Sequence, residues 1–326
     1  MKVLIADGLE KEGIALFAGE GSVKADVHSS LSPEVLKEKI SDYEGLIVRS
    51  ASKVTAAVVA SAPRLKVIGR AGIGYDNIDV DAASRRGIVV MNTPGANAIT
   101  TAEHAISLLL AISRHIPQAA ASLKAGKWEK KKFMGVEVFD QTLGVIGLGN
   151  IGQVVADRAR GVKMRVIAFD PFLTEESMAK RGGDRVPFEE LLARSDYITV
   201  HTPLTDSTRN LIDARAFKLM KKGVRLINCA RGGIINERDL YDAIKQGIVA
   251  GAALDVFEQE PPEGNPLLGL DEVIATPHLG ASTTQGQARV AEAIARQVRD
   301  YLEKGIVTNA VNVPSVSPEM LERVRP

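Results

Sequence analysis

The sequence has one cysteine, few aromatic residues and almost no net charge. Its single cysteine, Cys229, excludes an internal disulfide framework and any zinc or iron–sulfur site built from several cysteines. The 41 Lys and Arg residues balance 40 Asp and Glu residues, so a formal charge of +1 gives no long-range field to attract nucleic acid or an anionic membrane. Long apolar runs are also missing, and the apolar start is too short for a secretory signal. We therefore expect a cytoplasmic protein with no nucleic acid or membrane partner.

Glycine and short aliphatic runs are plentiful by contrast. The 326 residues include 29 Gly and 14 Pro, while aromatic residues make up only 4%, a composition typical of many tight turns and aliphatic strands. The aliphatic runs alternate with amphipathic stretches of helical length, which predicts parallel β-sheet with helical crossovers. The predicted strands are 2–7, 45–50, 65–70, 87–92, 142–147, 165–170, 197–202, 224–229, 252–257 and 272–277.

Two long helical segments are predicted to join two sheets, because these strands are too many for one ordinary open sheet. The segments are 100–116 and 282–305. Thr100 and Ser282 each stand three residues before a Glu or Gln, which is the spacing of a capping box. Pro117 and Gly305 stand where these two helices should end.

The fold class that follows is α/β, with two doubly wound parallel-sheet domains. We predict a Rossmann nucleotide-binding domain, residues 99–283, inserted into a smaller flavodoxin-like substrate-binding domain. The smaller domain would be discontinuous and consist of residues 1–98 and 284–326.

A glycine-rich loop follows the predicted strand 142–147. The G-x-G-x-x-G motif contains Gly147, Gly149, Asn150, Ile151 and Gly152. Glycines at these positions permit a tight turn and a close approach of a pyrophosphate to the positive end of the following helix. Asp170 ends the next strand, where a carboxylate can accept hydrogen bonds from ribose hydroxyls and would repel a 2′-phosphate. The motif therefore predicts dinucleotide binding, with NAD favoured over NADP.

Polar residues also follow the other strands of the second half. They are His201, Thr202, Pro203, Cys229, Ala230, Arg231, Asp255, Glu258, Glu260, His278, Gly280 and Ala281. The carboxyl ends of parallel strands meet at one edge of a sheet, so an Arg, several acids and a His should converge there. This set suits hydride transfer to a 2-oxo acid, since Arg can hold a carboxylate and His can exchange the accompanying proton.

The residue pattern alone leaves several roles open. It does not choose between His201 and His278, which both end strands. We expect Cys229 to be a small buried side chain rather than a nucleophile. His104 and His115 lie in the predicted helix 100–116, where a packing or surface role is favoured. No metal-binding motif is present, and we expect no required metal.

Two arginines end strands of the first half. Arg49 and Arg70 are each followed by a loop of small residues. Two guanidinium groups on neighbouring strands could hold a dianion such as a phosphate, although solvated strand-end charges are the alternative. The basic run Lys127–Lys132 is expected to be solvated unless it lies near the site.

Together the motifs resemble the D-isomer-specific 2-hydroxyacid dehydrogenase family, and within it the phosphoglycerate branch. The resemblance covers essentially the whole chain. The segments that carry it are 68–79, 92–103, 126–135, 143–152, 201–205, 228–237, 253–262 and 277–283.

The resemblance implies a division of roles among these residues. Arg231 would bind the substrate carboxylate, His278 would be the acid/base, and Glu260 would be the partner of His278. Asp255 would hold the nicotinamide carboxamide. Further cofactor-lining positions would be His201, Thr202, Pro203, Cys229, Ala230, Gly280 and Ala281. Substrate-binding positions would be Arg49, Ser50, Arg70, Gly72, Ile73 and Asn97.

The implied reaction is NAD-dependent oxidation of 3-phospho-D-glycerate to 3-phosphohydroxypyruvate, the first step of serine biosynthesis. A glyoxylate or hydroxypyruvate reductase is the alternative within the family, and an NAD-responsive corepressor-like binding protein is a remote one. The resemblance also suggests a homodimer, and domain closure that excludes water.

Two departures from the family pattern stand out. Lys130 replaces an Arg of the basic segment, and additional serine-sensing C-terminal domains, with their feedback control, are expected to be absent.

Overall fold

The computed structural model describes residues 1–18 and 21–314, which fold into two compact units. The first unit consists of residues 1–97 together with the described residues from 281 onward, and the second consists of residues 98–280. Residues 315–326, which the sequence assigns to the discontinuous domain, lie outside the described residues. In the part of the chain that is described, no helix is both long enough and apolar enough to cross a membrane.

The first unit contains a five-stranded sheet in the order β2-β1-β3-β4-β5, and every neighbouring pair is parallel. This order is the one found in flavodoxin-like folds. The strands are β1 Lys2–Ile5, β2 Lys24–Val27, β3 Gly45–Val48, β4 Val67–Arg70 and β5 Val89–Met91. The helices are α1 Lys11–Ile14, α2 Pro33–Lys39, α3 Ala56–Ala60, α4 Val80–Arg85 and α12 Thr284–Lys304, with 3-10 turns at Ala15–Phe17 and Ile40–Asp42.

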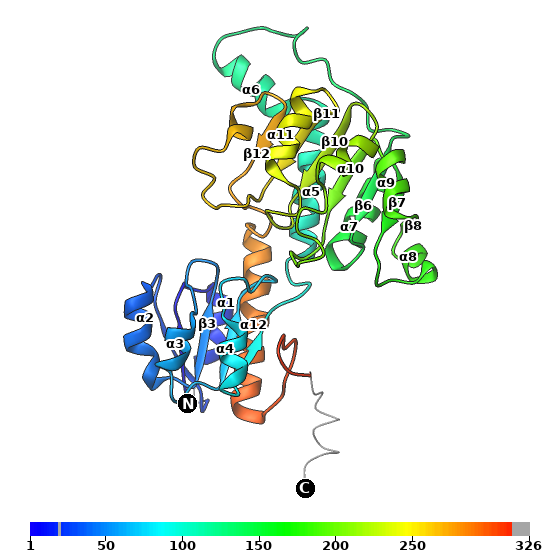
Figure 1. The fold of residues 1–326 in the computed structure, drawn as a ribbon. Helices are drawn as coiled ribbons and strands as arrows, with labels where there is room; N and C mark the ends of the chain where they lie inside the picture. The colour runs from blue at the N-terminus through cyan, green and yellow to red at the C-terminus, as the bar shows by residue number, and fades with distance from the viewer. Residues whose placement is uncertain (19–20, 315–326) are drawn as a thin grey trace. The chain divides into compact units, whose positions relative to one another are not determined.

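The second unit contains a seven-stranded parallel sheet in the order β12-β11-β10-β9-β6-β7-β8. The strands are β6 Thr142–Ile146, β7 Arg165–Phe169, β8 Asp184–Arg185, β9 Tyr197–Val200, β10 Val224–Asn228, β11 Val249–Leu254 and β12 Val273–Ala275. The helices are α5 Ala98–Ser113, α6 Ile116–Lys124, α7 Asn150–Gly161, α8 Glu175–Lys180, α9 Phe188–Arg194, α10 Ala214–Leu219 and α11 Glu237–Lys245, with a 3-10 turn at Pro266–Gly269 (Figure 1). Strand β6 lies between β7 and β9, so the strand order reverses there, as in a Rossmann fold. The predicted fold class is therefore confirmed.

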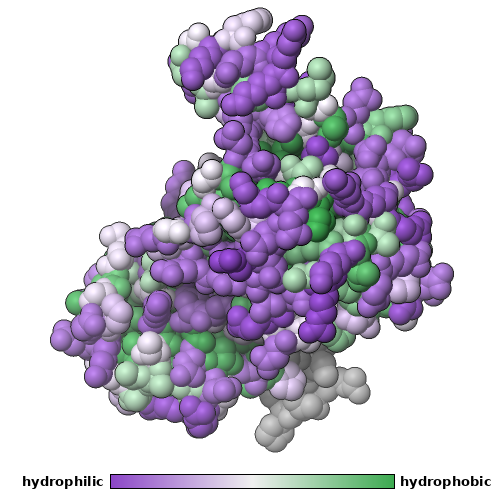
Figure 2. Space-filling view, turned by 45° about the horizontal axis from the view of Figure 1, so that its top comes forward, coloured by the Kyte–Doolittle hydropathy of each residue, from purple (hydrophilic) through white to green (hydrophobic). Residues whose placement is uncertain are grey.

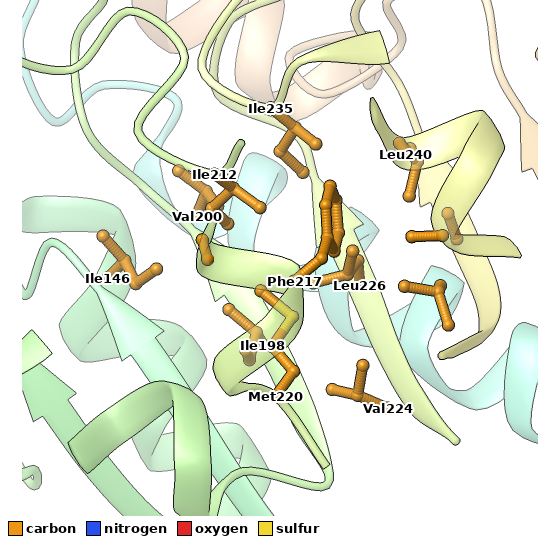
Figure 3. Packing of buried hydrophobic residues seen from close by; sticks show 14 of the residues in the cluster. Ile146, Ile198, Val200, Ile212, Phe217, Met220, Val224, Leu226, Ile235 and Leu240 are labelled. Atoms are coloured by element: carbon orange, nitrogen blue, oxygen red, sulfur yellow. The ribbon is translucent and has the colours of Figure 1, made fainter. Parts of the chain in front are cut away.

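Helices cover both faces of each sheet, which explains why the strands other than the edge strands β2 and β8 are largely apolar and buried. In the second unit, α5 and α7 cover one face, and α9, α10 and α11 cover the other. Figure 3 shows the packing on the second of these faces, where residues from strands and helices surround the ring of Phe217. In the first unit, α12 covers the face opposite α2, α3 and α4.

Hydrophilic residues predominate on the face of the molecule shown in Figure 2, and hydrophobic residues lie there in separate small patches.

Both predicted capping boxes are wrong. Helix α5 begins at Ala98, so Thr100 lies inside its first turn and is buried. Thr283, rather than Ser282, caps α12, because the side chain of Thr283 accepts a hydrogen bond from the N–H of Gly286 at 3.0 Å. Gly305 does end α12, with a positive φ of 72°.

The predicted helix 100–116 is also wrong at its end. His115 has a φ of 51°, which breaks the helical backbone, and a new helix, α6, follows. Pro117 stands in the first turn of α6. Backbone N–H groups at this position have no partner within the helix, so a proline there costs no helical hydrogen bond. His115 therefore lies between two helices.

Two strands have no counterpart in the predicted set. Strand β2 is largely exposed, and β8 has only two residues. Both lie at sheet edges, so neither has the buried apolar run by which the other strands were predicted.

We expect Phe217→Ala to lower the free energy of unfolding by about 3–5 kcal/mol, because it leaves a cavity in a close-packed core. Phe217 is 2% exposed, whereas Phe172 is 93% exposed and serves as the matched control. Phe172→Ala should change the same quantity by less than about 0.5 kcal/mol. Urea denaturation followed by circular dichroism measures both, and equal effects would contradict the packing described.

Candidate active site

The glycine-rich loop connects β6 to α7 at the point where the strand order reverses. Gly147 has a φ of 87°, a conformation that L side chains rarely adopt. A Cβ on Gly152 would overlap the carbonyl oxygen of Gly147, whereas a Cβ on Gly149 would meet no atom within 4 Å. The first and third glycines therefore allow the turn to fold, and the second leaves open space beside the start of α7. The first N–H groups of a helix lack partners within the helix and favour negative charge.

Two further segments border this loop. A Cβ on Gly147 would lie 2.7 Å from the carbonyl oxygen of His201 and 2.8 Å from Cγ2 of Thr202, so the ends of β6 and β9 are close. The hydroxyl of Thr202 is buried and has no hydrogen-bond partner among the described residues. The Asp170 carboxylate accepts hydrogen bonds from the N–H groups of Leu148 and Phe172, both at 3.0 Å, and keeps further acceptor positions. An open helix start, a nearby carboxylate and an unpaired hydroxyl fit a dinucleotide.

His201 and His278 have contrasting surroundings. Burial lowers the pKa of His201 to about 3, so its imidazole is neutral at physiological pH. Its Nε2 lies 2.8 Å from the hydroxyl of Thr199 on the same strand. The side chain of His278 is 48% exposed, and its Nδ1 lies 2.8 Å from Oε2 of Glu260. Of the two, His278 has the environment of a proton donor.

The tautomer of His278 follows from the state of Glu260. Burial alone would raise the pKa of Glu260, but the hydrogen bond and charge of His278, the N–H of Phe257 and the charge of Arg231 together lower it. An ionised carboxylate only accepts hydrogen bonds, so Nδ1 of His278 carries a proton. Its Nε2 is then the nitrogen that can exchange a proton with a bound molecule.

Arg231 lies on the turn that follows β10. The side chain of Asn228 braces this turn, because Nδ2 donates to the carbonyl oxygen of Arg231 at 2.9 Å and Oδ1 accepts from the N–H of Ala230 at 3.0 Å. A Cβ on Gly232 would overlap the backbone of Phe257, so the turns after β10 and β11 pack tightly together. The structure thus brings Arg231, Glu260 and His278 to one edge of the sheet.

Asp255 directly follows β11 and is fully buried. Its Oδ1 accepts from the Thr276 hydroxyl at 2.5 Å and the Leu279 N–H at 2.7 Å, and Oδ2 accepts from the Gly280 N–H at 2.7 Å. The ring of His104, on α5, also contacts Oδ1 at 3.1 Å. Burial alone would raise the pKa of Asp255, but the hydrogen bonds from His104, Thr276 and Leu279 lower it overall.

Cys229 is buried, as expected, and is close to Asp255. Burial and the charge of Asp255 both raise the pKa of its thiol, which disfavours the reactive thiolate. His104, Cys229 and Asp255 have potential metal-ligand atoms within 4.8 Å of one another. Both oxygens of Asp255 already accept hydrogen bonds from the turn after β12, and Oδ1 also contacts His104, so Asp255 serves as a hydrogen-bond acceptor.

Besides Arg231 and His278 in the second unit, the substrate-binding residues predicted from the sequence lie in the first unit. Arg49 follows β3, and its Nη1 is 3.1 Å from Oε1 of Glu10. The Asp7 carboxylate accepts from the N–H groups of Arg49 and Ser52, and the Asn77 amide donates to the carbonyl oxygens of the same two residues at 2.7 Å. The loop that contains Ser50 is therefore held from both sides.

Arg70 is the last residue of β4, and its register partner on β3 is Val48. Its Nη1 donates to the carbonyl oxygen of Ala71 at 2.9 Å, and its guanidinium lies against Gly72, which has a φ of 144°. The carbonyl oxygen of Ile73 accepts from the side chain of Asn92 at 2.6 Å. Asn97 is buried, and its Oδ1 has no partner among the described residues.

Several residues of the site were missed from the sequence. His104, Thr276 and Asn228 contact predicted site residues, and Asp7 and Asn77 hold the loop after β3. His104 and Asp255 are 151 residues apart in the chain, and no local motif links them. A polar residue close behind a strand was the one available signal: Thr276 directly follows β12, and Asp7 stands two residues after the end of β1.

Comparison with known proteins gives a consistent result. Residues 106–280 match the family described as D-isomer specific 2-hydroxyacid dehydrogenase, NAD binding domain. The chain is 47% identical to the D-3-phosphoglycerate dehydrogenase of Methanocaldococcus jannaschii and 50% identical to that of Archaeoglobus fulgidus. Each alignment covers the whole of this chain and 62% of the relative, so the chain spans less than two thirds of these proteins.

Among solved structures, a glyoxylate reductase from Paecilomyes thermophila is similar, with a TM-score of 0.85 and 31% identity. The alignment covers 95% of this chain and 97% of that one.

Alanine substitutions at the glycines of the loop should distinguish effects on folding from effects on NADH binding. Gly149→Ala should leave the melting temperature unchanged and weaken NADH binding about tenfold or more, since its methyl group enters the space where a pyrophosphate approaches the backbone. Gly152→Ala should lower the melting temperature, because its Cβ overlaps the Gly147 carbonyl. Gly161→Ala, at the other end of α7, also meets open space and should change neither quantity. Thermal melts and NADH fluorescence titration are the measurements, and unchanged binding by Gly149→Ala would argue against this cradle.

Proposed function

The chain belongs to the D-isomer specific 2-hydroxyacid dehydrogenases, and we propose that it oxidises 3-phospho-D-glycerate to 3-phosphohydroxypyruvate with NAD. The observation that carries the reaction type is the 2.8 Å contact between His278 and Glu260, with Arg231 on the neighbouring turn. The similarity to curated D-3-phosphoglycerate dehydrogenases over the whole chain supports the substrate. On this proposal the protein supplies the first step of serine biosynthesis.

In the proposed reaction, Arg231 binds the carboxylate of the substrate by paired hydrogen bonds. Nε2 of His278 accepts the proton of the C2 hydroxyl, and the Glu260 carboxylate stabilises the imidazolium that results. Bound NAD would accept the hydride that leaves C2. In the reverse direction, the imidazolium returns its proton to the carbonyl oxygen as the hydride is delivered.

The cofactor would lie along the carboxyl ends of the second unit's strands. We propose that Gly147, Gly149, Asn150, Ile151 and Gly152 receive the pyrophosphate and that Asp170 accepts the ribose hydroxyls. The carboxylate of Asp170 disfavours a 2′-phosphate and so supports NAD. Asp255 would face the nicotinamide carboxamide. The remaining lining positions in this proposal are His201, Thr202, Pro203, Cys229, Ala230, Gly280 and Ala281.

Contacts to the phosphate are assigned to the first unit. We propose that Arg49 and Arg70 bind it, since Arg70 ends β4 and Arg49 directly follows the neighbouring parallel strand β3. Arg49 would exchange its contact with Glu10 for a contact with the phosphate. The other proposed substrate contacts are Ser50, Gly72, Ile73 and Asn97.

We also propose a cytoplasmic homodimer built on the second unit. Helix α6 and the segment after it extend from the rest of that unit (Figure 1). The exposed side chains of this arm, residues 116–139, include Trp128, Met134 and Phe139, which are 82%, 79% and 65% exposed. Large apolar side chains grouped on one arm are typical of a protein–protein contact.

Turnover should depend on the charge of the Glu260 carboxylate. Burial alone would raise the pKa of Glu260, but the hydrogen bond and charge of His278 lower it overall, so this carboxylate is ionised at neutral pH. Glu260→Gln keeps the size of the side chain but removes the charge that stabilises the imidazolium, and kcat should fall about tenfold or more. Glu258→Gln, which changes an exposed carboxylate two residues away, should leave kcat unchanged. Initial rates at neutral pH measure both variants, and an unchanged kcat for Glu260→Gln would contradict the assigned pair.

The decisive test compares NADH oxidation with phosphohydroxypyruvate, hydroxypyruvate and glyoxylate. We expect kcat/KM to be about 100-fold or more higher for the phosphorylated substrate, because two charge-assisted contacts are lost without the phosphate. Arg70→Ala should lower the rate mainly with that substrate. Equal efficiency with all three would favour the glyoxylate or hydroxypyruvate reductase alternative.

His278→Ala tests the enzyme class in the same assay. It should reduce kcat about 1000-fold or more while NADH still binds. Near-normal turnover by this variant would exclude the proposed acid/base.

A further inference from the structure

His278 occupies a backbone conformation that its own side chain does not favour. Its φ is 55°, in the left-handed region, which is unfavourable for a residue other than glycine. The conformation persists where surrounding contacts fix it. The N–H of His278 donates to the carbonyl oxygens of Asp255 at 2.9 Å and Thr276 at 3.0 Å. The turn that contains the proposed acid/base is therefore tied to the end of β11.

The Asp255 side chain fixes the remainder of this turn. Three hydrogen bonds to its carboxylate come from Thr276, Leu279 and Gly280, the residues on either side of His278. Two of the donors are backbone N–H groups: that of Leu279 donates to Oδ1, and that of Gly280 donates to Oδ2. Because Oδ1 and Oδ2 face different donors, a rotation or protonation of this carboxylate would release at least one of them. The position of His278 thus depends on a correctly oriented, ionised Asp255.

His104 contacts this carboxylate from a different element, α5. Its Nε2 lies 3.1 Å from Asp255 Oδ1 and 3.2 Å from the Thr276 hydroxyl oxygen. The Thr276 hydroxyl has one hydrogen, which it donates to Asp255, and the carboxylate has none, so both neighbours of Nε2 are acceptors. Nε2 must therefore carry a proton. It does so in the charged form of the ring and in one neutral tautomer, and the contact does not require a charged imidazole.

We propose that His104 is a positioning residue, which holds the Asp255 carboxylate and the Thr276 hydroxyl in place and thereby fixes the turn on which His278 lies. The proposal rests on the function proposed above, because it explains how the acid/base pair of His278 and Glu260 is held in position. His104 donates to Asp255, Asp255 accepts from the turn, and the turn presents His278 to Glu260. None of these contacts requires His104 to touch substrate or cofactor.

The test uses two substitutions that differ in hydrogen bonding. His104→Leu removes the donor and keeps an apolar side chain, whereas His104→Gln supplies an N–H in its place. His28→Leu is the matched control, because His28 lies in the first unit, whereas His104 and the turn after β12 that it contacts belong largely to the second. Hydrogen–deuterium exchange of the peptide spanning residues 276–281, melting temperature, kcat and KM are measured for each full-length variant.

We expect His104→Leu to speed exchange of the Leu279 and Gly280 amides about tenfold or more and to lower kcat about tenfold or more, because a small misplacement of His278 is costly. KM should change less than about threefold. His104→Gln should restore exchange and kcat to within about threefold of the parent, and His28→Leu should change neither.

Two outcomes would overturn the proposal. One is parent-like exchange and kcat in His104→Leu, and the other is equal impairment by Leu and Gln, which would indicate that His104 acts through packing alone. If His104→Leu does not fold, His104→Ser replaces it and faces the same two outcomes.

The exchange measurement needs no turnover. If the parent protein shows no activity with any 2-oxo acid, the proposed function fails, while the effect of His104 on the turn is still decided.

Discussion

Parallel pairing of the strands is the constraint on which the site depends. Strands β6, β9, β10, β11 and β12 all run in the same direction, so their carboxyl ends lie at one edge of the sheet. The residues that follow each strand then meet, although they are separated by tens of residues in the chain. Buried apolar strands permit this arrangement, because helices cover both faces and leave the edge as the place for polar groups.

Close backbone approach gives the edge its geometry. Gly152 allows the start of α7 to pack against Gly147, and Gly232 allows the turn after β10 to pack against the backbone of Phe257. Any side chain at either position would separate two segments that have to touch. The open space at Gly149 has the opposite cause, since none of the described residues fills it. The same residue type therefore serves packing at two positions and access at a third.

Local environment assigns different properties to similar residues. His201 and His278 both follow strands, yet burial keeps the imidazole of His201 neutral, whereas Glu260 accepts a hydrogen bond from His278. Asp255 and Glu260 are both ionised, but Asp255 is enclosed by the turn that it holds and Glu260 faces the histidine. The division of roles arises from hydrogen-bond partners and burial, and residue type alone does not determine it.

The sequence by itself determined the α/β class, the two parallel sheets, and the set of residues at the strand ends, because apolar runs and glycine spacing are local patterns. Local patterns were insufficient where tertiary contacts compete with them. Thr100 has a capping-box spacing but lies inside α5, and β2 and β8 are edge strands without a buried apolar run. The residue pattern did not choose between His201 and His278, and only the family resemblance favoured His278. The tertiary structure alone showed the burial and contacts that distinguish the two and placed His104 against Asp255, because contacts between distant segments are set when the chain folds.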